Sequence, residues 1–497
     1  MSLLLVHEQQ RSFRVVFMIE LWERFGFYGM VALLVLYMTQ QLGMSDKQAN
    51  LTWGAAAALI YAAPALGGLI GDRLLGSKRT MLIGTFILAI GYCLLAWPTH
   101  AVWPLYLSLG IVVVGNGLFK PNAANLVRKI YEGDEARLDS AFTLYYMAVN
   151  VGSVASMLIT PWVKIKIGWH AAFGVCSIGL ILGLLNYRLM SNALSLSNIH
   201  DNLSQVKFKT FVWVVMGALI SAILVAVLLN WENIALLAVI SASLAAIILF
   251  INIVRQCSYE ERRRLSAVFI FILQTILLFV FYQQMSTSLT LFALREVDPQ
   301  MKFFSIPLFT WDPAQFQACN PMWIMLLSPV LAKCYNHFGR DGRDMSLAGK
   351  FAFGFILTAL GFFVFGASSD TAMDGRASSW LIVAGYGLTA AGELLISGLG
   401  LAMISRYVPV RFSGVMIGIY YAATGGAQYL GSVVANLAQV VPNHVNQDVD
   451  VMNGYIYLFN LLGWLAAAGA FLSIILMPVI QKLTTNVSTI SDKPVRI

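Results

Sequence analysis

The sequence predicts an all-α integral membrane protein with fourteen transmembrane helices. Of its 497 residues, 59% are hydrophobic and only 11% are charged, which is too apolar for a soluble domain of ordinary composition. A helix needs about 20 mostly apolar residues to span a bilayer, and the chain contains fourteen such stretches. Its lysines and arginines also gather on one side of these stretches, as in multi-pass membrane proteins.

The predicted helices form groups of six, two and six. The longest polar interruption among the first helices, 187–209, follows the sixth helix, and the charged stretch 260–264 follows the eighth. We therefore expect an N-terminal six-helix bundle over 1–190, a linker with two extra transmembrane helices over 191–264, and a C-terminal six-helix bundle with a cytoplasmic tail over 265–497. Two six-helix halves are typical of transporters built from repeats. The helices are predicted near residues 13–41, 50–71, 80–98, 103–127, 139–160, 170–190, 210–230, 233–254, 265–292, 314–335, 347–367, 378–405, 412–436 and 453–481.

The basic residues predict the orientation of the chain in the membrane. Of the 32 lysines and arginines, 24 lie on the side of the two termini and 6 on the other. The side richer in Lys and Arg is cytoplasmic, so both termini are predicted to be cytoplasmic. The other two, Arg24 and Lys120, fall inside predicted helices. Because the basic residues are spread over short loops, the net charge of +8 does not indicate nucleic-acid binding.

The first predicted helix carries three charged side chains, Glu20, Glu23 and Arg24. Charge at membrane depth is costly, so such groups turn inward and usually mark a substrate or ion path. At about 100° per residue, Glu23, Arg24 and Tyr28 all fall within about 80° of Glu20. One helix face therefore carries two carboxylates, a guanidinium and a phenol.

The loop after the second predicted helix reads Gly68-Leu-Ile-Gly-Asp72-Arg73-Leu-Leu-Gly76-Ser-Lys78-Arg79. This pattern resembles the cytoplasmic loop signature of the major facilitator superfamily. Its glycines allow a tight turn, and its basic residues hold the loop at the cytoplasmic face. The resemblance implies a major facilitator fold of two six-helix bundles plus two extra central helices.

Four further polar residues interrupt the predicted helices. Lys120 lies late in the fourth helix, and Asn150 lies in the middle of the fifth; Gln317 and Asn320 open the eighth of the twelve core helices. Lys120 has an alternative interpretation as a helix-end cation that reaches water. For each Asn or Gln, the alternative is a hydrogen bond between helices.

Glu393 is the only acid within the predicted core of a second-half helix. A structural ion pair is the alternative, but no second-half cation is predicted at its depth. Arg24 and Lys120, in the first half, can hold a carboxylate, whereas Glu393 can hold an ammonium. The ligand implied is a zwitterion, and a short peptide fits well. Further hydrogen-bonding groups come from Asn150, Asn320, Tyr28, Tyr61 and Tyr145.

Over nearly its whole length, the chain resembles the proton-coupled oligopeptide transporters, and is most similar to the bacterial dipeptide and tripeptide permeases. The marks that carry the resemblance are E-x-x-E-R-F from Glu20, Lys120-Pro-Asn, F-T-L-Y-Y-M-A-V-N-V-G-S from Phe142, and F-Q-A-C-N-P from Phe316. The resemblance implies alternating access, with H⁺ entering alongside the peptide.

The family's binding roles transfer to matching residues of this chain. The groups implied to hold the peptide carboxylate are Arg24, Tyr28 and Lys120. Those implied to hold the peptide amine and backbone are Glu393, Asn150 and Asn320. The carboxylates implicated in proton coupling are Glu20 and Glu23. Residues expected to line the pocket are Tyr61, Tyr145, Gln284, Gln317 and Tyr420.

Three features of the sequence depart from the family pattern. Many members have an acid in the seventh core helix, where this chain has Gln283, which cannot titrate. Proton coupling would therefore fall on Glu20 and Glu23, with Glu393 as a further candidate. The eleventh core helix has Tyr420 and Tyr421 in place of a common Trp, and the motif's tyrosine pair has Phe27 as its first member.

The expected function is a proton-coupled symporter that imports dipeptides and tripeptides across the bacterial inner membrane. The alternative is a major facilitator carrier of another small organic anion or a drug. An enzyme is not expected, because the intramembrane polar residues form neither a nucleophile with a base nor a metal set. We expect no cofactor, with the proton as coupling ion, and a monomer in contact with peptides, protons and the lipid bilayer.

Overall fold

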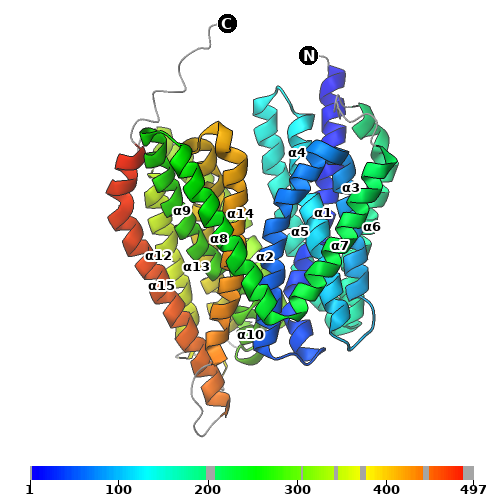
Figure 1. The fold of residues 1–497 in the computed structure, drawn as a ribbon. Coiled ribbons are helices and arrows are strands. Elements are labelled where there is room, and N and C mark those ends of the chain that lie inside the picture. The colour runs from blue at the N-terminus through cyan, green and yellow to red at the C-terminus, as the bar shows by residue number, and fades with distance from the viewer. Residues whose placement is uncertain are drawn as a thin grey trace. The chain divides into compact units, whose positions relative to one another are not determined.

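Long helices make up almost all of the fold (Figure 1). The computed structural model describes residues 3–196, 207–303, 306–340, 345–369, 376–439 and 447–484. In these ranges fourteen helices have 19 residues or more, so the predicted number is confirmed. The α-helices are α1 (Leu3–Gln40), α2 (Asp46–Ile70), α3 (Ser77–Leu95), α4 (Trp103–Ile130), α5 (Glu135–Lys166), α6 (Trp169–Leu196), α7 (Phe208–Asn230), α8 (Glu232–Gln256), α9 (Tyr259–Gln283), α10 (Ser288–Arg295), α11 (Cys319–Arg340), α12 (Leu347–Gly366), α13 (Ser379–Tyr407), α14 (Ser413–Ala435) and α15 (Gln447–Thr484).

Eleven helices among the described residues are long and apolar enough to cross a membrane. Three long helices are less apolar: α1, α11 and α14. Helix α1 contains Glu20, Glu23 and Arg24, and α11 contains Asn320. The lower hydropathy of α1 and α11 therefore coincides with the predicted site residues. Charged side chains at membrane depth face the protein interior rather than lipid.

The seventh predicted core helix, 265–292, is interrupted. Helix α9 ends at Gln283, a 3₁₀ turn covers Gln284–Ser286, and α10 begins at Ser288. The Thr290 hydroxyl donates to the carbonyl of Met285 at 2.8 Å. Hydroxyl side chains that bond to nearby backbone compete with regular helical hydrogen bonds, and short 3₁₀ turns commonly join such segments.

A small β-hairpin, which the all-α prediction missed, follows α10. Strand β1 (Gln300–Phe303) pairs antiparallel with β2 (Ile306–Thr310), with Gln300 opposite Thr310. The 3₁₀ helix η3 (Pro313–Ala318) then leads into α11 and is capped by Asp312.

The predicted signature loop is mostly helical. A π-helical turn, η1 (Gly71–Leu75), continues α2, and Gly76 then turns the chain at φ 82°, a conformation that favours glycine. The carboxylate of Asp72 accepts a hydrogen bond from the Asn125 amide of α4 at 3.1 Å. The motif therefore ties the end of α2 to α4.

Close contacts divide the chain into two compact units. Unit 1 comprises 1–238, 285–295 and 299–325; unit 2 comprises 239–284, 296–298 and 326–497. In unit 1, α3 packs on α4, and α1 packs on both α5 and α6; in unit 2, α15 packs along α12 and α14 packs on α9 (Figure 1). This grouping does not test the predicted six, two, six domain boundaries, which stay a prediction.

Unit 1 includes segments from the second half of the sequence. Trp53 on α2 donates to Ser286 at 2.8 Å, and Gln315 of η3 donates to the backbone of α5 at Leu158 at 3.0 Å. Arg295 of α10 forms two hydrogen bonds with Asp46 at the start of α2, at 2.5 and 2.7 Å. The segments α10 and η3 thus pack on helices of the first half.

Candidate functional site

The charged face of α1 forms a buried ion cluster. Glu20, Glu23 and Arg24 are 2%, 0% and 4% exposed. Arg24 Nε lies 3.3 Å from Glu20 Oε1 and donates a hydrogen bond to Glu23 Oε2. Because an unpaired buried charge is strongly destabilising, these ion pairs stabilise the three charged side chains in the protein interior.

One nitrogen of the Arg24 guanidinium donates no hydrogen bond within the described part of the chain. This atom, Nη2, is buried and has no hydrogen-bond partner among the described residues. The guanidinium carbon lies 5.2 Å from the centre of the Phe27 ring. Since a guanidinium presents a planar fork of five donors that matches a carboxylate, the free Nη2 can bind an anionic group.

Helix α5 supplies the next groups of the cluster. The Tyr145 hydroxyl donates a hydrogen bond to Glu20 Oε2. Asn150 is 6% exposed, and its amide donates to the Tyr146 carbonyl of its own helix at 2.9 Å. Helix α5 approaches α1 closely at Gly152, where a Cβ atom would lie only 2.6 Å from the Leu21 carbonyl oxygen.

Helices α2 and α4 bring a second cation to the site. The Lys120 ammonium of α4 lies 5.2 Å from the centre of the Tyr61 ring of α2, a cation–π distance. No ion pair joins Lys120 to a carboxylate in the described part of the chain. The first-half residues predicted for carboxylate binding therefore lie on helices that pack together in unit 1, with Tyr28 half-buried one turn after Arg24.

Sequence reasoning missed Asn116, one turn before Lys120 on α4. Its amide donates to Glu23 Oε1 at 3.3 Å, and the side chain is 1% exposed. The signal available in the sequence was an Asn within an apolar helix, four residues before a lysine that was predicted as a site residue.

Gln317 in unit 1 makes hydrogen bonds between segments, as its alternative interpretation expected. It is fully buried, and its amide donates to the Ala32 carbonyl of α1 at 3.3 Å and to the Thr290 hydroxyl of α10 at 2.8 Å. Asn320, one turn later on α11, is 7% exposed. The Gln317 amide nitrogen thus joins η3 to α1 and α10, whereas its Oε1 atom has no hydrogen-bond partner among the described residues.

The predicted residues of unit 2 lie on α13, on α14 and in the 3₁₀ turn that follows α9. Gln284 is fully buried and donates to the carbonyls of Val280 and Gly431, each at 2.9 Å. Tyr420 is 5% exposed and packs against α13 at Gly400. Glu393 is half-buried on α13. The hydrogen bonds of Gln284 join α9 to α14.

Gln283, which replaces the family's acid, also joins these two helices. Its amide donates to the Ser432 hydroxyl at 2.9 Å, and the side chain is 2% exposed. The approach is close, because a Cβ on Gly431 would lie 2.6 Å from the Gln283 Cβ. Gln283 is therefore a neutral, buried contact between helices.

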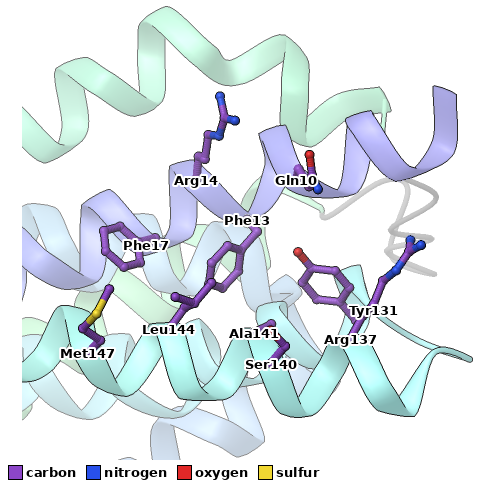
Figure 2. Close-up of a pocket in the computed structure, with 10 residues that line it drawn as sticks. All are labelled: Gln10, Phe13, Arg14, Phe17, Tyr131, Arg137, Ser140, Ala141, Leu144 and Met147. Atoms are coloured by element: carbon purple, nitrogen blue, oxygen red, sulfur yellow. The ribbon is translucent and has the colours of Figure 1, made fainter. Parts of the chain in front are cut away.

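A pocket of about 520 Å³ lies between the first half of α1 and α5 (Figure 2). Phe13 and Phe17 point from α1 toward α5, where Leu144 and Met147 lie. Phe17 precedes Arg24 by seven residues, or about two helical turns, so both fall on the same face of α1. The lining residues are Gln10, Phe13, Arg14, Phe17, Tyr131, Arg137, Ser140, Ala141, Leu144 and Met147.

Gln10, Tyr131, Arg137 and Ser140 lie at the end of this pocket away from Met147 (Figure 2). Arg137 pairs with Asp134, with 3.2 Å between Nε and Oδ2. The Tyr131 ring meets Phe13 edge-on at 5.9 Å, and burial raises the pKa of the Tyr131 phenol. Tyr131 is therefore neutral at ordinary pH. None of these ten residues was predicted as a site residue.

Comparisons with known proteins give consistent results. A model of the POT family matches residues 78–452. Dipeptide and tripeptide permease A of Erwinia pyrifoliae is 36% identical over 481 residues, which cover 96% of each chain. The permease of the same name from Escherichia coli K12 is 35% identical over 481 residues, covering 96% of this chain and 94% of that one.

Solved structures show the same likeness. A bacterial homologue of the human drug peptide transporters PepT1 and PepT2 is 47% identical, with a TM-score of 0.86, covering 96% of this chain and 100% of that one. Tetrameric PepTSo2 has the same identity and coverages and a TM-score of 0.87. A variant of the peptide transporter POT, in complex with alafosfalin, is 26% identical, with a TM-score of 0.81 and 96% coverage of both chains.

Proposed function

Because the chain belongs to the POT family, we propose that it imports dipeptides and tripeptides together with protons. It has the major facilitator fold of its structural neighbours, is a multi-pass membrane protein, and is a transporter rather than an enzyme. The peptide substrates, the proton as coupling ion and alternating access are parts of the proposal.

The observation that carries the proposal is the unfilled donor of Arg24. A buried Nη2 without a partner in the described part of the chain costs free energy unless a ligand satisfies it. Lys120, which has no ion pair among those residues, adds a second cation. Two cations that bind one carboxylate favour ligands with an anionic end group over ligands without one. We assign the C-terminal carboxylate of the peptide to Arg24 and Lys120, with Tyr28 as a further donor.

The amine end is assigned on the family resemblance. Glu393 is the proposed partner of the peptide ammonium, and Asn150 and Asn320 are the proposed partners of the amine and backbone. A carboxylate is the natural partner of an ammonium at membrane depth, because both charges are costly there when unpaired.

Glu20 and Glu23 are the proposed proton carriers. Both pair with Arg24, so a peptide carboxylate that binds at Nη2 competes with them for the charge of the guanidinium. A carboxylate that loses its cationic partner in a buried site takes up a proton more readily. This competition couples peptide binding to proton binding, and it requires no titrating group at Gln283.

The proposal is tested in proteoliposomes under an inward proton gradient. Accumulation of a labelled dipeptide should collapse when a protonophore is added, whereas persistent accumulation would refute proton coupling. Competition by dipeptides and tripeptides, without competition by single amino acids, excludes the carrier of another organic anion or drug. Glu23→Gln should retain counterflow exchange and lose proton-driven accumulation. Glu393→Gln should weaken binding of a free-amine peptide more than that of an N-capped analogue.

We further propose a location in the bacterial inner membrane with both termini cytoplasmic. The distribution of Lys and Arg in the sequence supports this orientation. We propose the single chain as the transporting unit; PepTSo2, at 47% identity, is tetrameric in its crystals. Mass measurement in detergent, together with transport by chains diluted to one per vesicle, tests this unit.

A further inference from the structure

Asn116 on α4 holds one oxygen of the Glu23 carboxylate. Asn116 Nδ2 lies 3.3 Å from Glu23 Oε1, and the two side chains are 1% and 0% exposed. The other oxygen, Oε2, accepts a hydrogen bond from Arg24 Nε. Glu23 is therefore held from two sides, by a neutral amide of α4 and by the cation that follows it on α1.

The second polar atom of the Asn116 amide, Oδ1, has no hydrogen-bond partner in the described part of the chain. This atom is buried, and no described residue donates a hydrogen bond to it. An unsatisfied buried acceptor costs free energy, and such atoms are uncommon in native proteins. Their presence beside a functional carboxylate points to a second hydrogen-bonding state.

The Tyr92 hydroxyl of α3 is a second buried atom without a partner in the described structure. The Tyr92 side chain is 0% exposed, and its ring packs on α1 at Gly26, where a Cβ would lie 2.8 Å from Tyr92 Cε2. The hydroxyl also interacts electrostatically with Glu23. The surroundings of Glu23 thus hold two polar atoms with unused hydrogen-bonding capacity.

An open acceptor becomes useful when Glu23 is protonated. An ionised carboxylate only accepts hydrogen bonds, whereas a carboxylic acid has an O–H that must donate one. Arg24 and Lys120 are donors only, and the oxygens of Glu20 are already engaged by Arg24 and Tyr145. The titratable groups that interact with Glu23 from α1, α3, α4 and α5 are Glu20, Arg24, Tyr92, Lys120 and Tyr145.

We propose that Asn116 is a positioning residue for proton coupling, and that its amide hydrogen-bonds Glu23 in both protonation states. Nδ2 donates to the ionised carboxylate, as observed. A half-turn of the amide presents Oδ1 to the O–H of the protonated acid. The proton comes from solution on one side of the membrane, binds a Glu23 oxygen and leaves to the other side. This inference rests on the proposed role of Glu23.

The test compares Asn116→Leu with a matched variant, Asn122→Leu. Leucine is close to asparagine in size but makes no hydrogen bond. Asn122 lies on the same helix, is 1% exposed and also has an unpartnered Oδ1 among the described residues. Its amide donates to the carbonyls of Gly67 and Leu118 instead of Glu23. It therefore controls for the loss of a buried amide from α4.

For Asn116→Leu we expect proton-driven dipeptide accumulation to fall about tenfold, the effect of one lost hydrogen bond. Equilibrium peptide binding and counterflow exchange should stay close to wild type, and the pH profile of uptake should shift. Asn122→Leu should change exchange and accumulation together or leave both unchanged, with the wild-type pH profile.

Wild-type accumulation and a wild-type pH profile in Asn116→Leu would overturn the inference. An equal loss of binding, exchange and accumulation would also overturn it, because that pattern indicates structural damage. If wild-type uptake itself ignores a protonophore, the proposed function fails instead. Should Asn116→Leu not fold, Asn116→Ala removes the amide without adding bulk and permits the same comparison.

A spectroscopic measurement tests the hydrogen bond without transport. In infrared difference spectra recorded across a pH change, the Glu23 carboxylic-acid band is the one that disappears in Glu23→Gln. The band should move to higher frequency in Asn116→Leu, because the acid loses its acceptor. A band unchanged from wild type would show that Asn116 does not contact the protonated acid.

Discussion

The Lys164 ammonium lies 2.6 Å from a carboxylate oxygen of Asp312, and the two side chains are only 13% and 6% exposed. Lys164 is near the end of α5, and Asp312 caps η3. The ammonium also lies 5.1 Å from the centre of the Trp169 ring. Within unit 1, this pair therefore joins a helix from the first half of the sequence to a segment from the second.

Asp312→Asn should destabilise the protein by about 1–3 kcal/mol, because the nearly buried Lys164 loses its partner. Asparagine retains the capacity to cap η3, so the loss reports mainly the charge. Thermal unfolding in detergent measures the effect, and the double variant with Lys164→Met should lose less than the two single variants added together.

Asp46→Asn provides the control, since its partner Arg295 is 37% exposed and exposed ion pairs contribute little. Its melting temperature should fall less than that of Asp312→Asn. Equal melting temperatures for Asp312→Asn and the wild type would contradict the prediction.

Lys120→Met should weaken binding of a dipeptide with a free carboxylate by about 10–100-fold, the value of a charge-assisted hydrogen bond. A C-terminally amidated dipeptide should bind equally to both proteins, because it offers no carboxylate. Unfolding should change little, since Lys120 has no ion pair among the described residues. Calorimetric titration with the two ligands makes the comparison.

Tyr61→Phe keeps an aromatic face beneath the ammonium and serves as the matched control. It should retain most of the preference for the free carboxylate. If Lys120→Met lost affinity equally for the free and the amidated peptide, Lys120 would act through structure instead of charge.

The sequence predicted the fold well because its signals are periodic and local. Apolar length sets each span, and the charges of Glu20, Glu23 and Arg24 identify the inward face of α1 without any tertiary information. Hydrogen bonds across distant segments leave no such signal. The pairing of Lys164 with Asp312 spans 148 positions, and that of Asn116 with Glu23 spans 93.

The hydrogen-bond partners of the predicted pocket residues Gln284 and Gln317 could not be predicted from the sequence for the same reason. Polar side chains in apolar helices face the interior in either role, as ligand contacts or as bonds between helices. Only the structure places the amide of Gln317 against the Ala32 carbonyl and that of Gln284 against Gly431. The β-hairpin was missed because its short strands lie in a stretch predicted as a loop.

Gln283→Leu should keep proton-driven accumulation, because Gln283 cannot titrate and the proposed carriers lie on α1. The variant loses the hydrogen bond to Ser432, and a lost hydrogen bond costs about 1 kcal/mol of unfolding free energy. Protonophore-sensitive uptake and thermal unfolding measure the two effects. Lost accumulation with normal peptide binding would place a coupling role at Gln283 and weaken the assignment to Glu20 and Glu23.

Ser140→Trp should slow uptake while leaving equilibrium peptide binding unchanged. Ser140 is exposed and lines the pocket between α1 and α5 (Figure 2). The pocket shares a face of α1 with Arg24 and lies toward the predicted cytoplasmic end, so we expect a released peptide to pass it. Product release limits the turnover of many enzymes, and we expect a bulky ring in the path to slow release of the peptide in the same way.

Initial uptake rates and calorimetric binding separate the two quantities for this variant. Thr143→Trp is the matched control, because Thr143 is an exposed residue of the same helix that does not line the pocket. It should leave uptake unchanged. A wild-type uptake rate in Ser140→Trp would remove the pocket from the release route, and a parallel loss of binding would show instead that the pocket communicates with the buried cluster at Arg24.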